Sequence, residues 1–84
     1  MKIIYTKHAL GKFQHLSIIK LGIKRKHVQE TIMQPERVLV EEDQITHLKV
    51  IDEKHTLKVV FKKVSDIILV ITFHPAQKGR YEKR

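Results

Sequence analysis

The spacing of apolar residues along the chain changes once, at Pro35. Before Pro35, apolar residues recur at steps of three and four, which is the period of an amphipathic helix. After it, apolar and polar residues alternate over much of the chain, which is the period of a strand with one buried face. The pattern therefore predicts helices in the first half of the chain and a sheet in the second.

The first half is expected to form one strand and two helices. Their expected ranges are 2–5, 7–21 and 24–34. Thr6 stands between the strand and the first helix, where its hydroxyl can accept a backbone N–H of the first turn. Gly11 weakens this helix, because glycine loses more backbone freedom on folding than other residues. Gly22 can supply the left-handed residue that ends it, and Pro35 ends the second helix.

The second half is expected to form four strands joined by short turns. Their expected ranges are 37–41, 44–51, 55–64 and 67–74. Turns of this length suit antiparallel hairpins, and the last strand is almost wholly apolar, which is typical of a central strand. Pro75 is expected to stop the sheet, leaving residues 76–84 as a polar, basic tail. The predicted fold is α+β, in the order β-α-α-β-β-β-β, with two N-terminal helices packed on one face of a twisted antiparallel sheet within residues 1–75.

Helices on one face of such a sheet leave the other face uncovered, and alternation predicts what that face carries. On the third of these four strands, Leu57, Val59 and Phe61 form an inward set. Because successive side chains point to opposite faces, Lys58 and Lys62 are expected on the uncovered face.

On the last strand, four apolar residues are expected to pack inward: Ile67, Leu69, Ile71 and Phe73. The uncovered face would then receive Ile68 and Val70, followed by Thr72 and His74. A histidine close to several cations has a lowered pKa, so it stays neutral at pH 7 and can accept a proton.

The strand 44–51 can be placed in either of two phases. Burial of Leu48 and Val50 is favoured by their apolar character, and it would expose His47 and Lys49. The uncovered face is then expected to collect two histidines, three lysines and a threonine: His47, Lys49, Lys58, Lys62, Thr72 and His74.

The net charge of the chain indicates what class of partner it attracts. Seventeen Lys and Arg residues face nine Asp and Glu residues, giving a formal net charge of +8 at pH 7 with neutral histidines. Such an excess attracts polyanions such as nucleic acid at long range and makes their binding weaken as salt rises. The alternative interpretation is a lysine-rich solvated surface that favours solubility and discourages edge pairing without any partner.

Composition also excludes several kinds of site and segment. The chain has no cysteine, so it has no disulfide and no thiolate metal site. Its six histidines lack the close spacing of a metal site, and we expect neither a metal nor another cofactor. The longest apolar run, residues 67–71, is far shorter than the roughly 20 residues that span a bilayer. The start lacks the apolar core of a signal peptide, so we expect a cytoplasmic protein with no membrane partner.

Four short motifs occur in an order that resembles a known family. They are Tyr5-Thr6-Lys7-His8-Ala9, Leu21-Gly22-Ile23, Gln34-Pro35-Glu36 and Ile71-Thr72. The set is similar to a family of small bacterial and archaeal domains of unknown function. That family looks like a branch of the RelE/ParE-like toxins, within the larger group that holds the barnase, EndoU and colicin-type ribonucleases. The resemblance extends from Tyr5 to about Tyr81.

This resemblance implies a metal-independent ribonuclease that cleaves RNA through the 2′-hydroxyl. Such chemistry needs a base for the 2′-OH proton, cations for the phosphate and an acid for the leaving 5′-oxygen. The family motif maps onto His8 as base and places Thr72 in the catalytic set with it. Lys58 or Arg80 would hold the phosphate, and Tyr81 or His74 would be the acid. The expected RNA-binding residues are Lys12, His47, Lys49, Lys62, His74 and Arg80.

The resemblance also implies partners and leaves alternatives open. The expected partners are RNA, including ribosome-bound mRNA, and an acidic antitoxin protein that covers the basic face. A second hypothesis is a binding module of the same fold that docks RNA or protein without turnover. A third is a ParE-like relative that acts on gyrase rather than on RNA.

Overall fold

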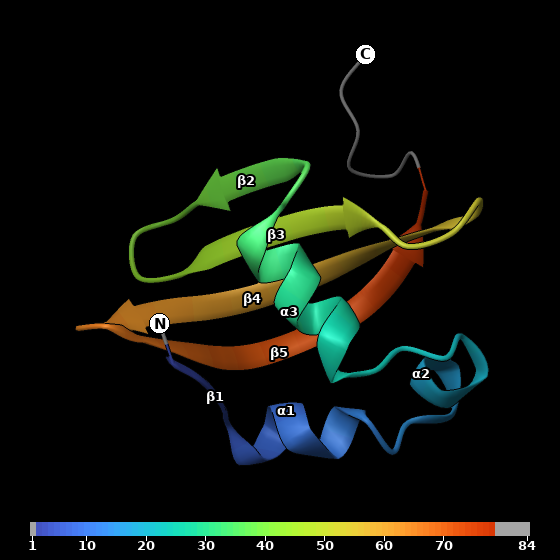
Figure 1. Cartoon of the computed structure of the whole chain (residues 1–84), viewed down its shortest axis with the longest axis horizontal. Helices are drawn as coiled ribbons and strands as arrows, with labels where there is room; N and C mark the ends of the chain where they lie inside the picture. Colours follow the sequence, from blue (N-terminus) through green and yellow to red (C-terminus); the bar gives the residue numbers. More distant parts are fainter. Residues whose placement is uncertain (1, 79–84) are drawn as a thin grey trace.

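The computed structural model describes residues 2–78 and forms an α+β domain (Figure 1). Its elements are β1 (Lys2–Tyr5), α1 (Lys7–Lys12), α2 (Leu16–Lys20), α3 (Arg25–Met33), β2 (Arg37–Val40), β3 (Ile45–Val50), β4 (His55–Val64) and β5 (Ile67–Gln77). Within that range the structure has three helices and one five-stranded sheet, with strand order β1-β5-β4-β3-β2. Each of these helices is too short or too polar to reach across a bilayer.

The sheet is mixed rather than wholly antiparallel. Strands β2 to β5 form consecutive antiparallel hairpins, as the turn spacing predicted. Strand β1, however, pairs in parallel with β5, with Ile3 beside Ile68 and Tyr5 beside Val70. The expectation of a purely antiparallel sheet was therefore wrong. The helices connect β1 to a strand β2 that runs in the opposite direction, and after three hairpin reversals β5 runs in the same direction as β1.

The helix expected over residues 7–21 is two helices. After α1, the backbone N–H groups of Phe13, Gln14 and His15 each bond the carbonyl three residues earlier, which tightens and ends the helix. His15 then adopts an extended conformation and begins α2. Gly11 lies at this break, where its low helix propensity costs about 0.5–1 kcal/mol relative to alanine. Gly22 has φ of 68°, so the predicted left-handed stop is confirmed.

The core lies between the helices and one face of the sheet (Figure 1). Its buried members are Ala9, Ile18, Ile23, Val28, Ile32, Leu57, Val59, Phe61, Ile68, Val70 and Phe73. Three aromatic rings link α1 to this core, because Phe13 contacts Tyr5 at 5.8 Å and Phe73 at 4.7 Å between ring centroids. The inward set predicted on β4 is confirmed, so Lys58 and Lys62 face the side without helices.

A β-bulge at Ile71 reverses the alternation within β5. The register with β4 pairs Phe61 with Val70 and Val60 with Thr72, so Ile71 has no partner across the ladder. Side chains before the bulge therefore take the opposite phase from that expected. Ile68 and Val70 are buried in the core, and the expectation that they would face outward was wrong.

The bulge also corrects the expected inward set on this strand. Ile67 and Leu69, expected in the core, lie on the uncovered face. Ile71, also expected in the core, is the unpaired residue of the bulge and is only partly buried, while Phe73 is inward as predicted. Thr72 and His74 lie on the uncovered face, also as predicted. The extra residue at the bulge shifts the alternation by one position. Residues before it therefore face the side opposite to the prediction, and residues after it face the predicted side.

Strand β5 continues through Pro75 to Gln77, so the expectation that Pro75 stops the sheet was wrong. Pro75 is paired with Leu57, and Gln77 with His55. Strand β1 pairs only with residues 67–70 of β5, which leaves the later half of β5 without a strand on that side. Proline is tolerated at such an edge, because its missing N–H removes no ladder bond.

Phe73→Ala is expected to lower the free energy of unfolding by about 3–5 kcal/mol, because the ring is fully buried and its removal leaves a cavity. Urea denaturation followed by circular dichroism measures this change. Leu16→Ala is the matched control, since Leu16 is largely exposed on α2 and its truncation should change stability by about 0.5 kcal/mol or less. Equal losses in both variants would contradict the assigned core.

Candidate functional site

A row of residues crosses the uncovered face of the sheet at right angles to the strands. The register pairs Arg37 with Leu48, Leu48 with Lys58, and Lys58 with His74, from β2 to β5. Neighbouring strands are about 4.8 Å apart, so the row is about 14 Å long. We call Arg37, Lys58 and His74, with Lys12 of α1 beside His74, the cationic row.

His74 is the titratable centre of this row. Burial lowers the pKa of its half-buried imidazole below the usual 6.5, and the positive charges of Lys58 and Lys12 lower that pKa further. The ring is therefore neutral at pH 7 and has a lone pair that can accept a proton. The sequence prediction that His74 lies beside a lysine on the uncovered face is confirmed for Lys58, and Lys12 of α1 adds a charge that was not predicted there.

The floor beside the row is apolar and closely packed. Leu48 and Val60 are 2% and 6% exposed, although they lie on the face opposite the helices. Thr72 is paired with Val60 and lies two residues before His74 on the same face. Thr72 is thus on the same face as the cationic row, as expected from the sequence.

Arg37 belongs to the row but was not predicted as a site residue. Its Nη1 atom is buried and has no hydrogen-bond partner among residues 2–78. Buried hydrogen-bond donors without a partner are uncommon in proteins. A guanidinium with such an unused donor can form a hydrogen bond to an oxyanion. The signal that could have found Arg37 is its pairing with Leu48, but that pairing requires the register of β2 on β3.

His47 and Lys49 lie under α3, so their predicted place on the uncovered face was wrong. The Nδ1 atom of His47 lies 3.3 Å from the carbonyl oxygen of Thr31 and 3.1 Å from that of Ile32. Lys49 Nζ donates to the carbonyl oxygen of Gln34 at 3.0 Å. The last carbonyls of a helix have no partner within the helix, and these two side chains supply donors there.

His47 also meets the core, because its ring lies edge-on to Phe61 with centroids 4.7 Å apart. Burial lowers the pKa of His47, the bonds to the Thr31 and Ile32 carbonyls raise it, and the charge of Lys63 lowers it. The net direction is downward. His47 is thus a structural residue at the end of α3 rather than part of the cationic row.

The remaining predicted residues are only partly assembled. His8 is exposed and lies one helical turn before Lys12, so both are on the same side of α1. Lys62 is on the uncovered face, but it is about 13 Å along β4 from Lys58. Arg80 and Tyr81 lie outside the described residues.

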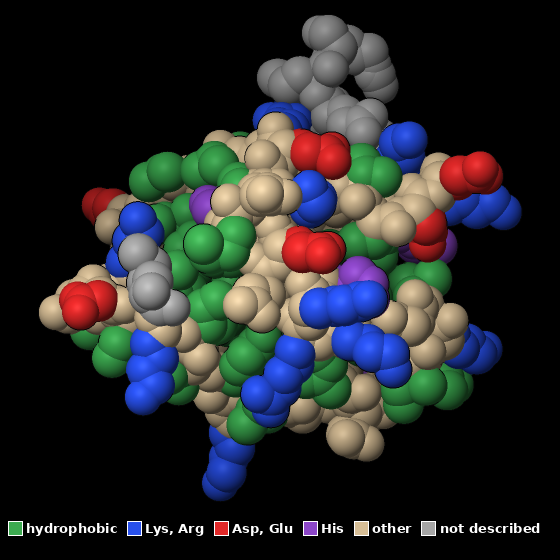
Figure 2. All heavy atoms as spheres, viewed as in Figure 1, with side chains coloured by type: hydrophobic (Ala, Val, Ile, Leu, Met, Phe, Trp, Pro, Cys, Tyr) green, Lys and Arg blue, Asp and Glu red, His purple; other side chains and the backbone are tan. Residues whose placement is uncertain are grey.

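Two further histidines, His27 and His55, have local partners. His27 Nδ1 accepts the backbone N–H of Lys24 at 2.8 Å, and His55 Nδ1 lies 3.0 Å from Asp52 Oδ1. Residues 2–78 contain no group of three or more metal-ligating side chains. On the helix side of the molecule, Figure 2 shows basic, acidic and apolar side chains intermixed. The arrangement on the opposite face instead sets cations around one neutral imidazole.

The sequence matches no family model, and neither a curated protein nor a solved structure matches it.

Lys58→Met is expected to raise the pKa of His74, because removing a nearby positive charge favours the protonated ring. The measurement is an NMR titration of the histidine ring protons. Lys63→Met on the same strand is the matched control, since Lys63 lies on the other face and acts on His47 instead. An unchanged His74 pKa in Lys58→Met would refute the proximity of the two groups.

The stability of the domain is expected to fall as the pH is lowered from 7.5 to 5. The folded-state pKa values of His47 and His74 lie below the usual 6.5, so the unfolded chain binds more protons in this range. Stability is therefore fully present above pH 6.5 and is lost as the pH falls through the folded-state values. Urea denaturation at each pH measures this, and His47→Phe should flatten the slope even though it lowers stability at every pH.

Proposed function

We propose that this protein is a RelE-like, metal-independent ribonuclease that binds RNA along the cationic row and cleaves it through the 2′-hydroxyl. One observation carries the proposal: on the face without helices, beside Lys58 and on the same face as Thr72, the pKa of His74 is lowered by burial and by the charges of Lys58 and of Lys12 at the end of α1. A neutral base surrounded by cations is what attack of a 2′-hydroxyl on a phosphodiester requires.

The reaction assigns a task to each group. The ring of His74 accepts the 2′-OH proton while the 2′-oxygen attacks the adjacent phosphorus atom. Lys58 and Lys12 bind the non-bridging oxygens, whose negative charge grows in the transition state. The bond from phosphorus to the 5′-oxygen then breaks, and that oxygen receives a proton from His8 or Tyr81. The products are a 2′,3′-cyclic phosphate and a free 5′-hydroxyl.

This scheme exchanges the roles first expected for the two histidines. The family motif pointed to His8 as the base and to His74 or Tyr81 as the acid. Burial and the neighbouring lysines lower the pKa of His74, and a group that is neutral at pH 7 is better suited to take a proton than to give one. His8, one turn before Lys12, is placed by helical geometry on the side of α1 that borders the row.

The proposal extends to fold family and partners. The α+β class, with one strand, three helices and then four antiparallel strands, supports a RelE-like fold, for which two helices were expected. RNA is favoured over DNA because only RNA supplies the 2′-hydroxyl nucleophile. The cationic row would also attract an acidic antitoxin, which would compete with RNA for Lys58 and Arg37. Ribosome-bound mRNA carries the same 2′-hydroxyl and phosphate groups, so it is a substrate for the same reaction.

A second candidate is a module that binds RNA without cleaving it. The specific observation in its favour is that, within residues 2–78, the row holds one imidazole and three permanent cations. Cations alone give salt-dependent binding to phosphates and no proton transfer. A gyrase-directed activity is distinguished from both, since it requires no RNA contact.

In a cleavage assay with end-labelled RNA in EDTA, the wild-type protein is expected to produce 2′,3′-cyclic phosphate ends. His74→Ala should reduce the rate by about 10²–10⁴-fold, which is the usual contribution of a general base. The rate should rise with pH below 6.5, because deprotonation of His74 precedes attack. Lys63→Ala, on the opposite face of β4, is the matched control and should cleave at the wild-type rate.

The same assay separates the alternatives. RNA binding that weakens with salt and in Lys58→Ala, without any cleavage, would establish the binding module. Absence of both binding and cleavage would exclude RNA as the target, and suppression of toxicity by gyrase variants would then support the third hypothesis.

A further inference from the structure

The outer edge of β2 is apolar and exposed. Strand β2 is the last strand of the sheet, so no other strand among residues 2–78 pairs with its outer edge. The exposed fractions are 49% for Val38, 36% for Leu39 and 74% for Val40. Exposed edges are usually protected by proline, by inward charges or by a covering segment, because free N–H and C=O groups accept another strand. Residues 37–40 carry no proline, and Arg37, at the start of the strand, is the one charged residue among them.

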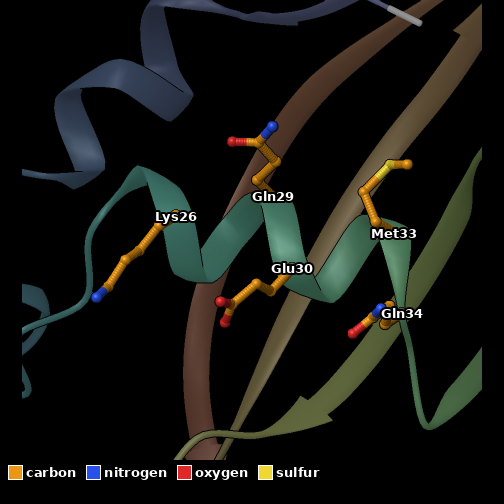
Figure 3. A pocket seen from close by; sticks show the side chains of 5 residues that line it. All are labelled: Lys26, Gln29, Glu30, Met33 and Gln34. Atoms are coloured by element: carbon orange, nitrogen blue, oxygen red, sulfur yellow. The ribbon is translucent and has the colours of Figure 1, made fainter.

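An apolar groove lies beside this edge. It has a volume of about 310 Å³ and is formed between the end of α3 and the sheet by Ile32, Met33, Val38, Val40 and Phe61 among others. Figure 2 shows hydrophobic side chains gathered on this part of the surface, over β2 and next to α3. By contrast, the hollow on the outer side of α3 is lined by one helix and its end, with polar side chains at most positions (Figure 3).

We propose that two copies of this chain pair edge to edge through β2, antiparallel, about a two-fold axis at Leu39. The N–H of Glu41 donates to the Gln44 carbonyl across the turn at 2.9 Å. In an antiparallel ladder alternate residues bond a given neighbour, so Arg37, Leu39 and Glu41 bond β3. The N–H and C=O groups of Val38 and Val40 therefore point away from the sheet. They can bond the second copy.

The register follows from the pattern of side chains. With Leu39 on the axis, Val38 lies opposite Val40 of the second copy and forms a hydrogen-bonded pair with it. Val38 and Val40 line the groove together with Met33. In the dimer each of these valines packs against a valine of the second copy, which covers its exposed side chain. Leu39 contacts its own symmetry mate on the uncovered face.

Charge complementarity selects a second copy as the occupant. In this register Arg37 lies directly opposite Glu41 of the second copy, and two-fold symmetry repeats the pair. The favourable charge contact of this register is the Arg37–Glu41 pair, made twice. Glu36 and Glu42 of the second copy also lie opposite each other, close to Lys49, whose positive charge offsets their repulsion. One strand supplies both halves of each contact, which is the requirement for a symmetric interface. Arg37 belongs to the cationic row as well, but the inference does not rest on the proposed ribonuclease function, because its tests measure association and not cleavage.

A single cysteine on the axis tests the geometry. The chain has no cysteine of its own, so Leu39→Cys introduces a unique thiol. Residues opposite each other in a non-hydrogen-bonded pair have Cα atoms about 4.5 Å apart, which lies within the range of about 4.4–6.8 Å for a disulfide. Mild oxidation should convert Leu39→Cys to a disulfide-linked dimer. Val64→Cys, exposed at the end of β4 and away from the proposed interface, is the control and should give no disulfide-linked dimer.

Sedimentation of the full chain tests the association itself. The wild-type protein is expected to approach twice its chain mass of 9.9 kDa as concentration rises. Val40→Lys and Glu41→Arg should each sediment as monomers, with unchanged circular dichroism because both positions are exposed. Adding Arg37→Glu to Glu41→Arg should restore the dimer by exchanging the paired charges. A wild-type monomer at all concentrations, a dimer that persists in Val40→Lys, or equal cross-linking of Val64→Cys would overturn the proposal.

Discussion

The hydroxyl of Thr6 joins the two parts of the structure on which the candidate site depends. It accepts the N–H of Ala9 at 3.0 Å, which begins α1, and it donates to the carbonyl oxygen of Ile71 at 3.0 Å, at the bulge. The bulge decides which side chains of β5 enter the core and which reach the uncovered face. Without this extra residue, burial of Val70 would carry Thr72 to the helix side with it, and the cationic row would lose His74.

Local patterns predicted most element boundaries, because caps and turns are short-range features. Thr6 caps α1 and Gly22 ends α2 as expected, and the range 55–64 of β4 was correct. The errors have non-local causes. The break after α1 was hidden by continuous apolar spacing, and the parallel pairing of β1 depends on a strand more than 60 residues away.

The face of a residue was predicted correctly on β4, where alternation is unbroken, and on the part of β5 that follows the bulge. Lys58 lies between the buried Leu57 and Val59. Thr72 and His74 lie on either side of the buried Phe73, so these three residues were placed on the correct face. His47 was misplaced, because the unsatisfied carbonyls at the end of α3 outweigh the hydropathy of its strand. Arg37 was missed because membership of the row depends on the register of β2 on β3, which the sequence does not display.

The cationic row has a thermodynamic consequence for the molecule as a whole. Lys12, Lys58 and Arg37 are brought together only by folding, so their mutual repulsion opposes the folded state and is relieved when the chain unfolds. A polyanion bound along the row cancels this repulsion and binds the folded chain in preference to the unfolded one. The melting temperature of this domain should therefore report how fully the row is occupied, whatever the chemical identity of the anion.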